Sequence, residues 1–147
     1  MTGSTTSFLF PDVNVWAALT HSSHVHHDVA RDWLESASDA RLCFCRFTQM
    51  GFLRLLTAQA VMGEEALNHV EAWRAYDVWL SDDRVRFLEE PESLERRFRA
   101  RTRSRQTATK AWADAYLAAF AEAGQITLVT FDRAFRRHLK PLILLSL

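Results

Sequence analysis

The chain has 147 residues, of which 48% are hydrophobic and 24% are charged, and this composition excludes a largely disordered protein. One domain spanning residues 1–147 is long enough to bury a sizeable core. The first ten residues lack the basic head and long apolar segment of a secretory signal, and every apolar run is too short to cross a membrane. We therefore expect a cytoplasmic protein without a membrane partner.

The formal net charge is zero, but the charges are unevenly distributed along the chain. Residues 64–95 contain ten of the 18 acidic side chains, and residues 96–105 contain six of the 18 Lys and Arg residues. An acidic segment is therefore followed directly by a basic one.

Short apolar runs alternate with segments of helical periodicity along the whole chain. Strands are predicted at residues 7–10, 41–44 or 45, 84–88, 126–130 and 142–145. Helices are predicted at residues 13–19, 28–37, 48–60, 63–80, 91 through the Arg-rich segment and 107–123, with a helical turn at 132–138. Strands that alternate with helices in this way predict a three-layer α/β/α sandwich around a parallel sheet of four to five strands.

Local signals set the expected ends of two helices. Glu64 and Glu65 would complement the positive end of a helix dipole, so the helix at 63–80 is expected to begin at Gly63. The alanine-rich helix at 107–123 is expected to stop at Gly124.

Cys43 and Cys45 are the only cysteines, and they lie two residues apart on a predicted strand. Side chains at this spacing point to the same face of a sheet, where they are not placed for a normal disulfide bond. No second pair of cysteines is available to complete a zinc site, so we expect two free thiols.

Three aspartates occupy positions that an ordinary solvated surface would not require. Asp12 follows the first predicted strand, Asp132 follows the fourth, and Asp114 shares one helix face with small residues in the row Ala111, Asp114, Ala118 and Ala121. Open α/β folds bind ligands at the carboxyl edge of the sheet, where Asp12 and Asp132 are expected. For Asp12 and Asp132 the simpler alternative is that each only caps the helix that follows it.

If the three carboxylates meet, their mutual repulsion would raise at least one pKa unless a cation lies among them. Oxygen ligands favour Mg²⁺ or Mn²⁺, and such ions are the usual means of attacking phosphodiesters. Asn14 and Thr130 would then add neutral oxygens or orient a water molecule.

Three segments together resemble the signatures of PIN-domain ribonucleases, and most closely those of the VapC toxins of bacterial toxin–antitoxin pairs. They are FPDVNV at residues 10–15, WADAYLAA at 112–119 and VTFDRAF at 129–135. The resemblance implies the strand order of the sheet and an endoribonuclease that cuts single-stranded or looped RNA, leaving a 5′-phosphate and a 3′-hydroxyl. It implies that Asp12, Asp114 and Asp132 hold the ion, with Asn14 and Thr130 close by. It also implies a homodimer and a small VapB-like antitoxin whose tail enters the active-site groove.

The chain departs from the family pattern in its third-helix region, RFTQMGFLR at residues 46–54. Many members have a Glu where this chain has Gly51, and Gln49 is the nearest neutral substitute. Loss of one carboxylate should weaken a second metal position more than the first. The sequence therefore does not decide whether one ion or two bind.

The six arginines of the basic segment suit an RNA backbone, because their charge attracts phosphate irrespective of base sequence. They are Arg96, Arg97, Arg99, Arg101, Arg103 and Arg105. The alternative is a solvated helix face paired with Glu92 and Glu95.

Two other residue classes invite a functional interpretation. The histidines His21, His24, His26 and His27 lack the spacing of a zinc protease and favour a polar loop near the groove. Among the tryptophans, Trp112 is the one candidate for substrate contact, because it lies two residues before Asp114, but packing is the favoured role for it as well.

Other folds and activities fit the pattern less well. A phosphorelay receiver needs paired acids after its first strand and a phospho-acceptor Asp after its third, where this chain has Glu89, Glu90 and Pro91. A haloacid-dehalogenase phosphatase needs Asp-x-Asp, and Asn14 replaces the second acid. The main alternative is a PIN-fold protein that binds RNA or a partner without nuclease activity, as the missing Glu allows.

Overall fold

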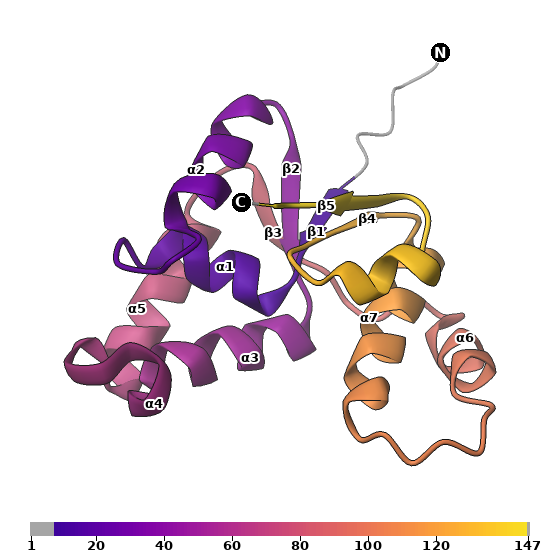
Figure 1. The fold of residues 1–147 in the computed structure, drawn as a ribbon. Coiled ribbons are helices and arrows are strands. Elements are labelled where there is room, and N and C mark those ends of the chain that lie inside the picture. The colour runs from indigo at the N-terminus through magenta and orange to yellow at the C-terminus, as the bar shows by residue number, and fades with distance from the viewer. Residues whose placement is uncertain (1–7, 147) are drawn as a thin grey trace.

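The computed structural model describes residues 8–146, and a five-stranded parallel sheet lies at its centre (Figure 1). The strands are β1 (Phe8–Pro11), β2 (Arg41–Phe44), β3 (Val85–Phe87), β4 (Thr127–Thr130) and β5 (Leu142–Leu144). Their order is β3-β2-β1-β4-β5, and every neighbouring pair is parallel. The predicted parallel α/β fold is confirmed; Ser7, where the first strand was expected to begin, lies outside the described residues.

Seven α-helices and two 3₁₀ helices surround the sheet within the described part of the chain. They are α1 (Val13–Thr20), α2 (His27–Ser36), α3 (Arg46–Thr57), α4 (Gln59–Met62), η1 (Gly63–Glu65), α5 (His69–Leu80), α6 (Leu94–Arg101), α7 (Lys110–Gly124) and η2 (Arg133–Arg137). Among residues 8–146, no helix combines the length and the apolarity that a membrane span requires.

The helices form one layer on each face of the sheet (Figure 1). On one face α1, α2, α3 and α5 enclose a core in which the buried rings of Trp16 and Phe44 stack with centroids 4.0 Å apart. On the other face α6 and α7 cover a second core, where Phe10 stacks on Phe120 at 5.0 Å. Both strand faces are therefore apolar, as expected for a central parallel strand.

Side chains of β2 alternate between these cores, which confirms the expectation for the cysteines. Leu42 and Phe44 belong to the first core, whereas Cys43 and Cys45 lie in the second. Both thiols are free and buried, and burial raises the pKa of each thiol.

The strand order changes direction between β1 and β4. The chain proceeds from β1 through β2 to β3 on one side and from β4 to β5 on the other. At this junction the backbone N–H of Asp12 donates to the carbonyl of Val129 at 2.8 Å. The carboxyl ends of β1 and β4 are therefore side by side at the topological switch point, where open α/β sheets bind ligands.

The predicted start of one helix on the first face of the sheet was wrong. The helix expected at 63–80 begins only at His69, and Glu64 and Glu65 instead form the 3₁₀ turn η1. Asn68 and Glu71 cap the true start reciprocally, since the Glu71 N–H donates to Asn68 Oδ1 at 2.8 Å and the Asn68 N–H donates to Glu71 Oε1 at 3.0 Å. This capping box satisfies two backbone donors, which outweighs a favourable charge in the first turn.

Two other helices also end or break differently from the prediction. The helix expected at 48–60 starts at Arg46 and divides at Ala58, whose backbone is extended (φ −85°, ψ 110°). The alanine-rich helix starts at Lys110 instead of residue 107 and includes Gly124. The left-handed position at its end is occupied by Gln125 (φ 55°), not by the glycine.

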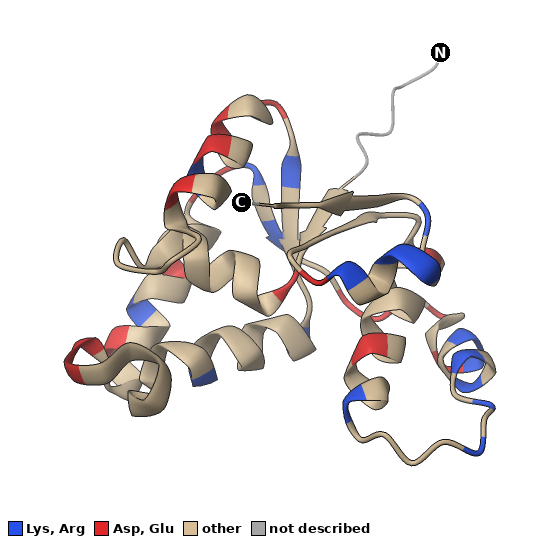
Figure 2. Cartoon of the chain, in the orientation of Figure 1, with Lys and Arg blue, Asp and Glu red and all other residues tan. Residues whose placement is uncertain are grey.

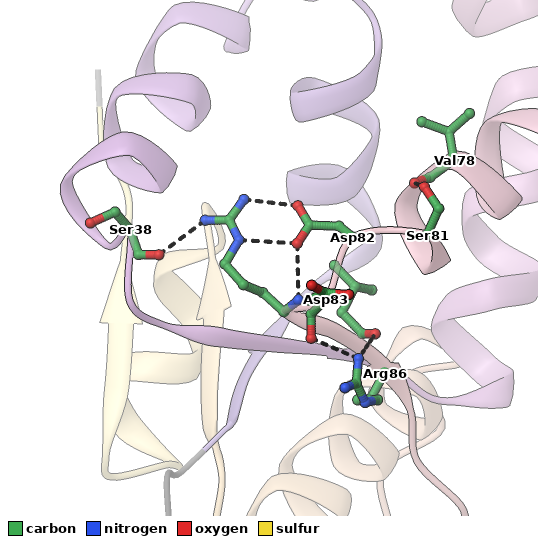
Figure 3. A network of polar contacts seen from close by, with 8 residues as sticks. Ser38, Val78, Ser81, Asp82, Asp83 and Arg86 are labelled. Atoms are coloured by element: carbon green, nitrogen blue, oxygen red, sulfur yellow. Dashed lines mark hydrogen bonds and ion pairs between the residues drawn. The ribbon is translucent and has the colours of Figure 1, made fainter.

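A network of ion pairs and hydrogen bonds lies at the edge of the sheet where the strands begin, which we call the amino edge (Figure 3). The Arg84 guanidinium contacts Asp82 at 3.0 and 3.2 Å and donates to the Ser38 carbonyl at 3.3 Å. Ser38 precedes β2 and Arg84 precedes β3, so the network ties together the two connections that enter these strands. It lies at the opposite edge of the sheet from Asp12.

Candidate active site at the carboxyl edge of the sheet

Asp12 stands between β1 and α1, and both of its carboxylate oxygens are engaged. Oδ1 accepts from the Val13 N–H at 2.7 Å, which caps α1, and Oδ2 accepts from the Thr130 hydroxyl at 2.9 Å. Asp12 therefore caps α1 with one oxygen while the other contacts β4, so its role as a cap does not exclude a place in a site at this edge.

Thr130 connects the ends of the two central strands. Its side chain is fully buried, and its hydroxyl oxygen also accepts from the Asp132 N–H at 3.0 Å. Asp132 Oδ1 in turn accepts from the Ala134 N–H at 2.9 Å, which caps η2. One hydroxyl thus fixes both the Asp12 carboxylate and the backbone of Asp132.

Lys110, which the sequence analysis missed, bridges the other two aspartates. Its Nζ lies 2.9 Å from Asp132 Oδ2 and 3.3 Å from Asp114 Oδ2. Lys110 stands four residues before Asp114 on α7, and this i,i+4 spacing was a visible signal for the first contact. The contact with Asp132 depends on how α7 packs against η2.

The three carboxylates influence one another electrostatically. Burial raises the pKa of Asp12, and the negative charges of Asp114 and Asp132 raise it further, while the hydrogen bonds from Thr130 and Val13 oppose the shift. The Lys110 ammonium, by contrast, holds the pKa of Asp132 below its usual range. Asp12 therefore feels the charges of Asp114 and Asp132, and the Lys110 ammonium pairs with those two aspartates.

The donor set suits a hard divalent cation. Its oxygens come from carboxylates and a hydroxyl, which Mg²⁺ and Mn²⁺ prefer, and Asp114 and Asp132 already share one cationic group. Within residues 8–146, no three His, Cys, Asp or Glu side chains lie close enough together to hold a metal ion in this structure. Water molecules would complete the coordination shell, as is usual for Mg²⁺.

Asn14 lies near Asp12 in the chain but does not join the hydrogen-bonded group. It is exposed in the first turn of α1. Within the described part of the chain, the side-chain bonds to Asp12 come from Thr130 and Val13 instead.

Gly51 faces the start of α1. A Cβ at this position would lie 2.5 Å from Val13 Cγ2, so the glycine permits α3 to approach the residue next to Asp12. Gln49 is buried and accepts from Arg46 Nη1 at 2.6 Å, beside Tyr76. These contacts direct Gln49 toward α5, so it does not replace the missing carboxylate.

The arginines of the basic segment divide into two groups. Arg97 and Arg101 pair with Glu122 of α7 at 3.3 and 3.1 Å, and Arg99 pairs with Glu95 at 2.9 Å. The remaining three, Arg96, Arg103 and Arg105, are exposed. Figure 2 shows basic residues along α6, the following loop and η2, whereas acidic residues predominate on α2 and η1.

The histidines between α1 and α2 have separate partners. His21 lies 3.1 Å from Glu65, His27 Nδ1 lies 2.7 Å from the Ala18 carbonyl, and the His26 ring stacks on Phe131 at 4.5 Å. Trp112 is 59% exposed and meets Phe98 edge-on at 6.0 Å. None of these contacts assigns a function to the residues.

Residues 9–140 match the family model of the PIN domain, and the chain therefore belongs to the PIN-domain family. Within that family it is of the VapC type. Ribonuclease VapC41 of Mycobacterium tuberculosis is 44% identical over 135 residues, which cover 88% of this chain and 92% of that protein. Ribonuclease VapC44 of the same organism is 30% identical over 125 residues, which cover 84% of each chain.

Solved structures share the fold at low sequence identity. VapC20 of Mycobacterium tuberculosis, described as a sarcin–ricin loop cleaving toxin, superposes with a TM-score of 0.62 at 20% identity, over 88% of this chain and 93% of that one. VapBC2 of Rickettsia felis, bound to a DNA fragment from its promoter, gives a TM-score of 0.64 at 16% identity, over 95% and 99%. The three-layer α/β/α sandwich is thus the PIN fold.

Proposed function

We propose that this protein is a metal-dependent endoribonuclease and the toxin of a type II toxin–antitoxin pair. The observation that carries the proposal is a chain of contacts at the carboxyl edge of β1 and β4: Thr130 links Asp12 to the backbone of Asp132, and Lys110 bridges Asp132 and Asp114. The 44% identity to Ribonuclease VapC41 supports the choice of RNA as the substrate. Action on RNA in turn favours a cytoplasmic location.

In this proposal Asp12, Asp114 and Asp132 hold Mg²⁺ or Mn²⁺. The bound ion would supply an activated water and stabilise the charge that develops on the phosphate. Thr130 keeps the Asp12 carboxylate in position, and the exposed Asn14 stands one residue inside α1, where a substrate or water can reach it. With Gly51 facing Val13, three carboxylates remain, and we favour a single tightly held ion.

The basic side of the molecule is the proposed RNA-binding surface. Arg96, Arg103 and Arg105 are exposed and would contact phosphates, because their charge is effective irrespective of base sequence. The other three arginines, Arg97, Arg99 and Arg101, are paired with Glu95 or Glu122, so we expect them to contribute less.

We also propose two protein partners. A VapB-like antitoxin is supported by the fold that this chain shares with a chain of the VapBC2 structure of Rickettsia felis. A homodimer is supported by the apolar side chains Met50, Val70 and Trp73 of α3 and α5, which are 52%, 61% and 46% exposed. Exposed apolar groups on adjoining helices are typical of protein interfaces.

Cleavage of a mixed RNA pool, with and without Mg²⁺, tests the proposed activity. Asp12→Asn should abolish cleavage, because the amide lacks the charge but still caps α1. Asp83→Asn, at the amino edge of the sheet, is the matched control and should cut as the native chain does. The products should carry 5′-phosphate and 3′-hydroxyl ends.

Two outcomes would contradict the proposal. Equal cleavage by the native chain and Asp12→Asn would remove the site assignment. RNA binding without cleavage by the native chain, with Mg²⁺ or Mn²⁺ present, would favour the alternative of a PIN-fold binding protein.

A further inference from the structure

A cavity of about 370 Å³ opens beside Asp114, between α7 and η2. Asp114 forms part of its wall, so the cavity adjoins the carboxylates. The end of α6 contributes Arg101, the loop between α6 and α7 contributes Gln106, and His138 follows η2.

The floor of the cavity is apolar and exists because one face of α7 carries small side chains. Ala111, Ala115 and Ala118 line this side, at i, i+4 and i+7. Phe135, which is 3% exposed, lies across from them. A larger residue at any of these alanines would occupy the space.

The polar groups lie around this apolar floor, and Arg101 is held firmly among them. Its Nη1 donates to the His138 carbonyl at 2.9 Å and its Nη2 donates to Glu122 at 3.1 Å. Within the described part of the chain, the Nε–H of Arg101 is buried without a hydrogen-bond partner. The Nε–H is out of reach of solvent, so the hydrogen bonds of Nη1 and Nη2 are what fix the guanidinium in the cavity wall.

We propose that this cavity receives a nucleobase of the RNA beside the cleaved phosphodiester and so selects the nucleotide that flanks the cut. The proposal rests on the proposed ribonuclease function. A nucleobase has flat apolar faces and a hydrogen-bonding edge, which match a floor of alanines and Phe135 with Arg101, Gln106 and His138 around it. The volume lies within the roughly 300–1,000 Å³ that is usual for small-ligand sites.

The charges favour a neutral base over an acidic peptide side chain. Glu122 already pairs with the Arg101 guanidinium, and the Asp114 carboxylate in the wall would repel another carboxylate. A base needs only hydrogen bonds and apolar contact, while its phosphate stays outside near the exposed arginines.

Cleavage-site mapping on a random-sequence RNA pool tests the inference. The native chain should prefer one nucleotide at a position adjoining the cut. Ala115→Leu, which fills the cavity, and Gln106→Ala, which removes a polar group from an exposed loop, should each reduce that preference about tenfold, the effect of roughly one lost hydrogen bond or a steric exclusion. Because preference is a ratio of cuts within one pool, a slower overall rate does not affect it.

Ala60→Leu is the matched control, since it adds the same side chain at an exposed position of α4, on the other face of the sheet from the cavity. It should keep the native preference. Unchanged preference in both Ala115→Leu and Gln106→Ala would overturn the inference. If these variants lose only the binding of an antitoxin, the cavity is a protein-docking site instead.

A binding measurement keeps the test independent of catalysis. Nucleoside monophosphates are titrated into Asp12→Asn and followed by NMR at the Gln106 side-chain amide and the Ala115 methyl. One of the four should produce saturable shifts that Ala115→Leu abolishes, even if the native chain cuts no RNA. No shift with any of the four would overturn the inference, whereas shifts without RNA cleavage would contradict only the proposed nuclease.

Discussion

The contact between Gly51 and Val13 leads to a prediction about stability. In Gly51→Ala the new Cβ would lie 2.5 Å from Val13 Cγ2, 3.2 Å from Cγ1 and 3.4 Å from Cβ. Relief by rotation about χ1 would require the rotamer that turns the Cβ hydrogen of Val13 toward Gly51, and a valine in a helix strongly prefers a single χ1 rotamer. Either α1 or α3 must therefore move.

The expected size follows from two opposing contributions. Overpacking typically costs about 1–3 kcal/mol, whereas replacing a helical glycine by alanine contributes about 1 kcal/mol of stability. We expect a net decrease of about 1 kcal/mol in the free energy of unfolding. For a domain of this length, that lowers Tm by roughly 4 °C.

Comparing Gly51→Ala in the native chain and in Val13→Ala tests this prediction, because Val13→Ala removes both methyl groups. In that background, Gly51→Ala meets only the Cβ at position 13, so the helix propensity should dominate and the substitution should stabilise the protein by about 1 kcal/mol. Urea unfolding of the four proteins gives a coupling free energy of about 2 kcal/mol. Destabilisation of the same size in both backgrounds, or stabilisation in both, would refute the reasoning.

The same contact bears on the missing carboxylate of the family pattern. Gly51→Glu carries the same Cβ, so it should displace Val13, the neighbour of Asp12, and lower stability. We therefore do not expect this substitution to raise cleavage, although it introduces the carboxylate that the resemblance to PIN-domain ribonucleases implies at this position.

Three further predictions concern Thr130, Asp82 and Trp73. Thr130→Val removes the hydrogen bond that lowers the pKa of Asp12, so the midpoint of Asp12 titration, followed by carboxyl NMR in EDTA, should move to higher pH. Asp82→Asn should lower the free energy of unfolding by about 1 kcal/mol at pH 7. The Arg84 guanidinium lowers the pKa of Asp82, so that contribution is complete above the unfolded pKa and is lost as pH falls through the folded pKa; the difference between the two proteins should shrink over that acidic range. Trp73→Glu should convert the proposed dimer to a monomer in light scattering, because it places a charge in an apolar interface.

Each of these has a matched control or a contradicting result. A lower or unchanged midpoint in Thr130→Val would show that the hydroxyl does not stabilise the Asp12 carboxylate. Asp83→Asn changes the neighbour of Asp82 and should leave stability nearly unchanged over the same pH range. Trp112→Glu, at an exposed tryptophan of α7, should leave the mass in solution unchanged, and a monomeric native chain would contradict the proposed dimer.

The local pattern of apolar residues was enough to predict where most strands and helices lie, because the two kinds of element differ in the period of these residues. The boundary errors at Gly63 and Gly124 had local causes. Asn68 and Glu71 display a capping box three residues apart, a signal in the sequence that outweighs the acidic pair before it. Gln125 in the left-handed conformation has no comparable signal, since glycine is the residue usually found there.

The sequence by itself determined that Asp12 and Asp132 follow strands and that Asp114 lies among small residues on one helix face, because these relations involve neighbours in the chain. The tertiary structure decided that β1 lies beside β4, which brings Thr130 within 2.9 Å of Asp12 across 118 residues. It also decided that Lys110 reaches Asp132 and that Glu122 pairs with Arg97 and Arg101. Contacts of this kind depend on the order in which strands pair and helices pack, and the periodicity of a single segment carries no record of that order.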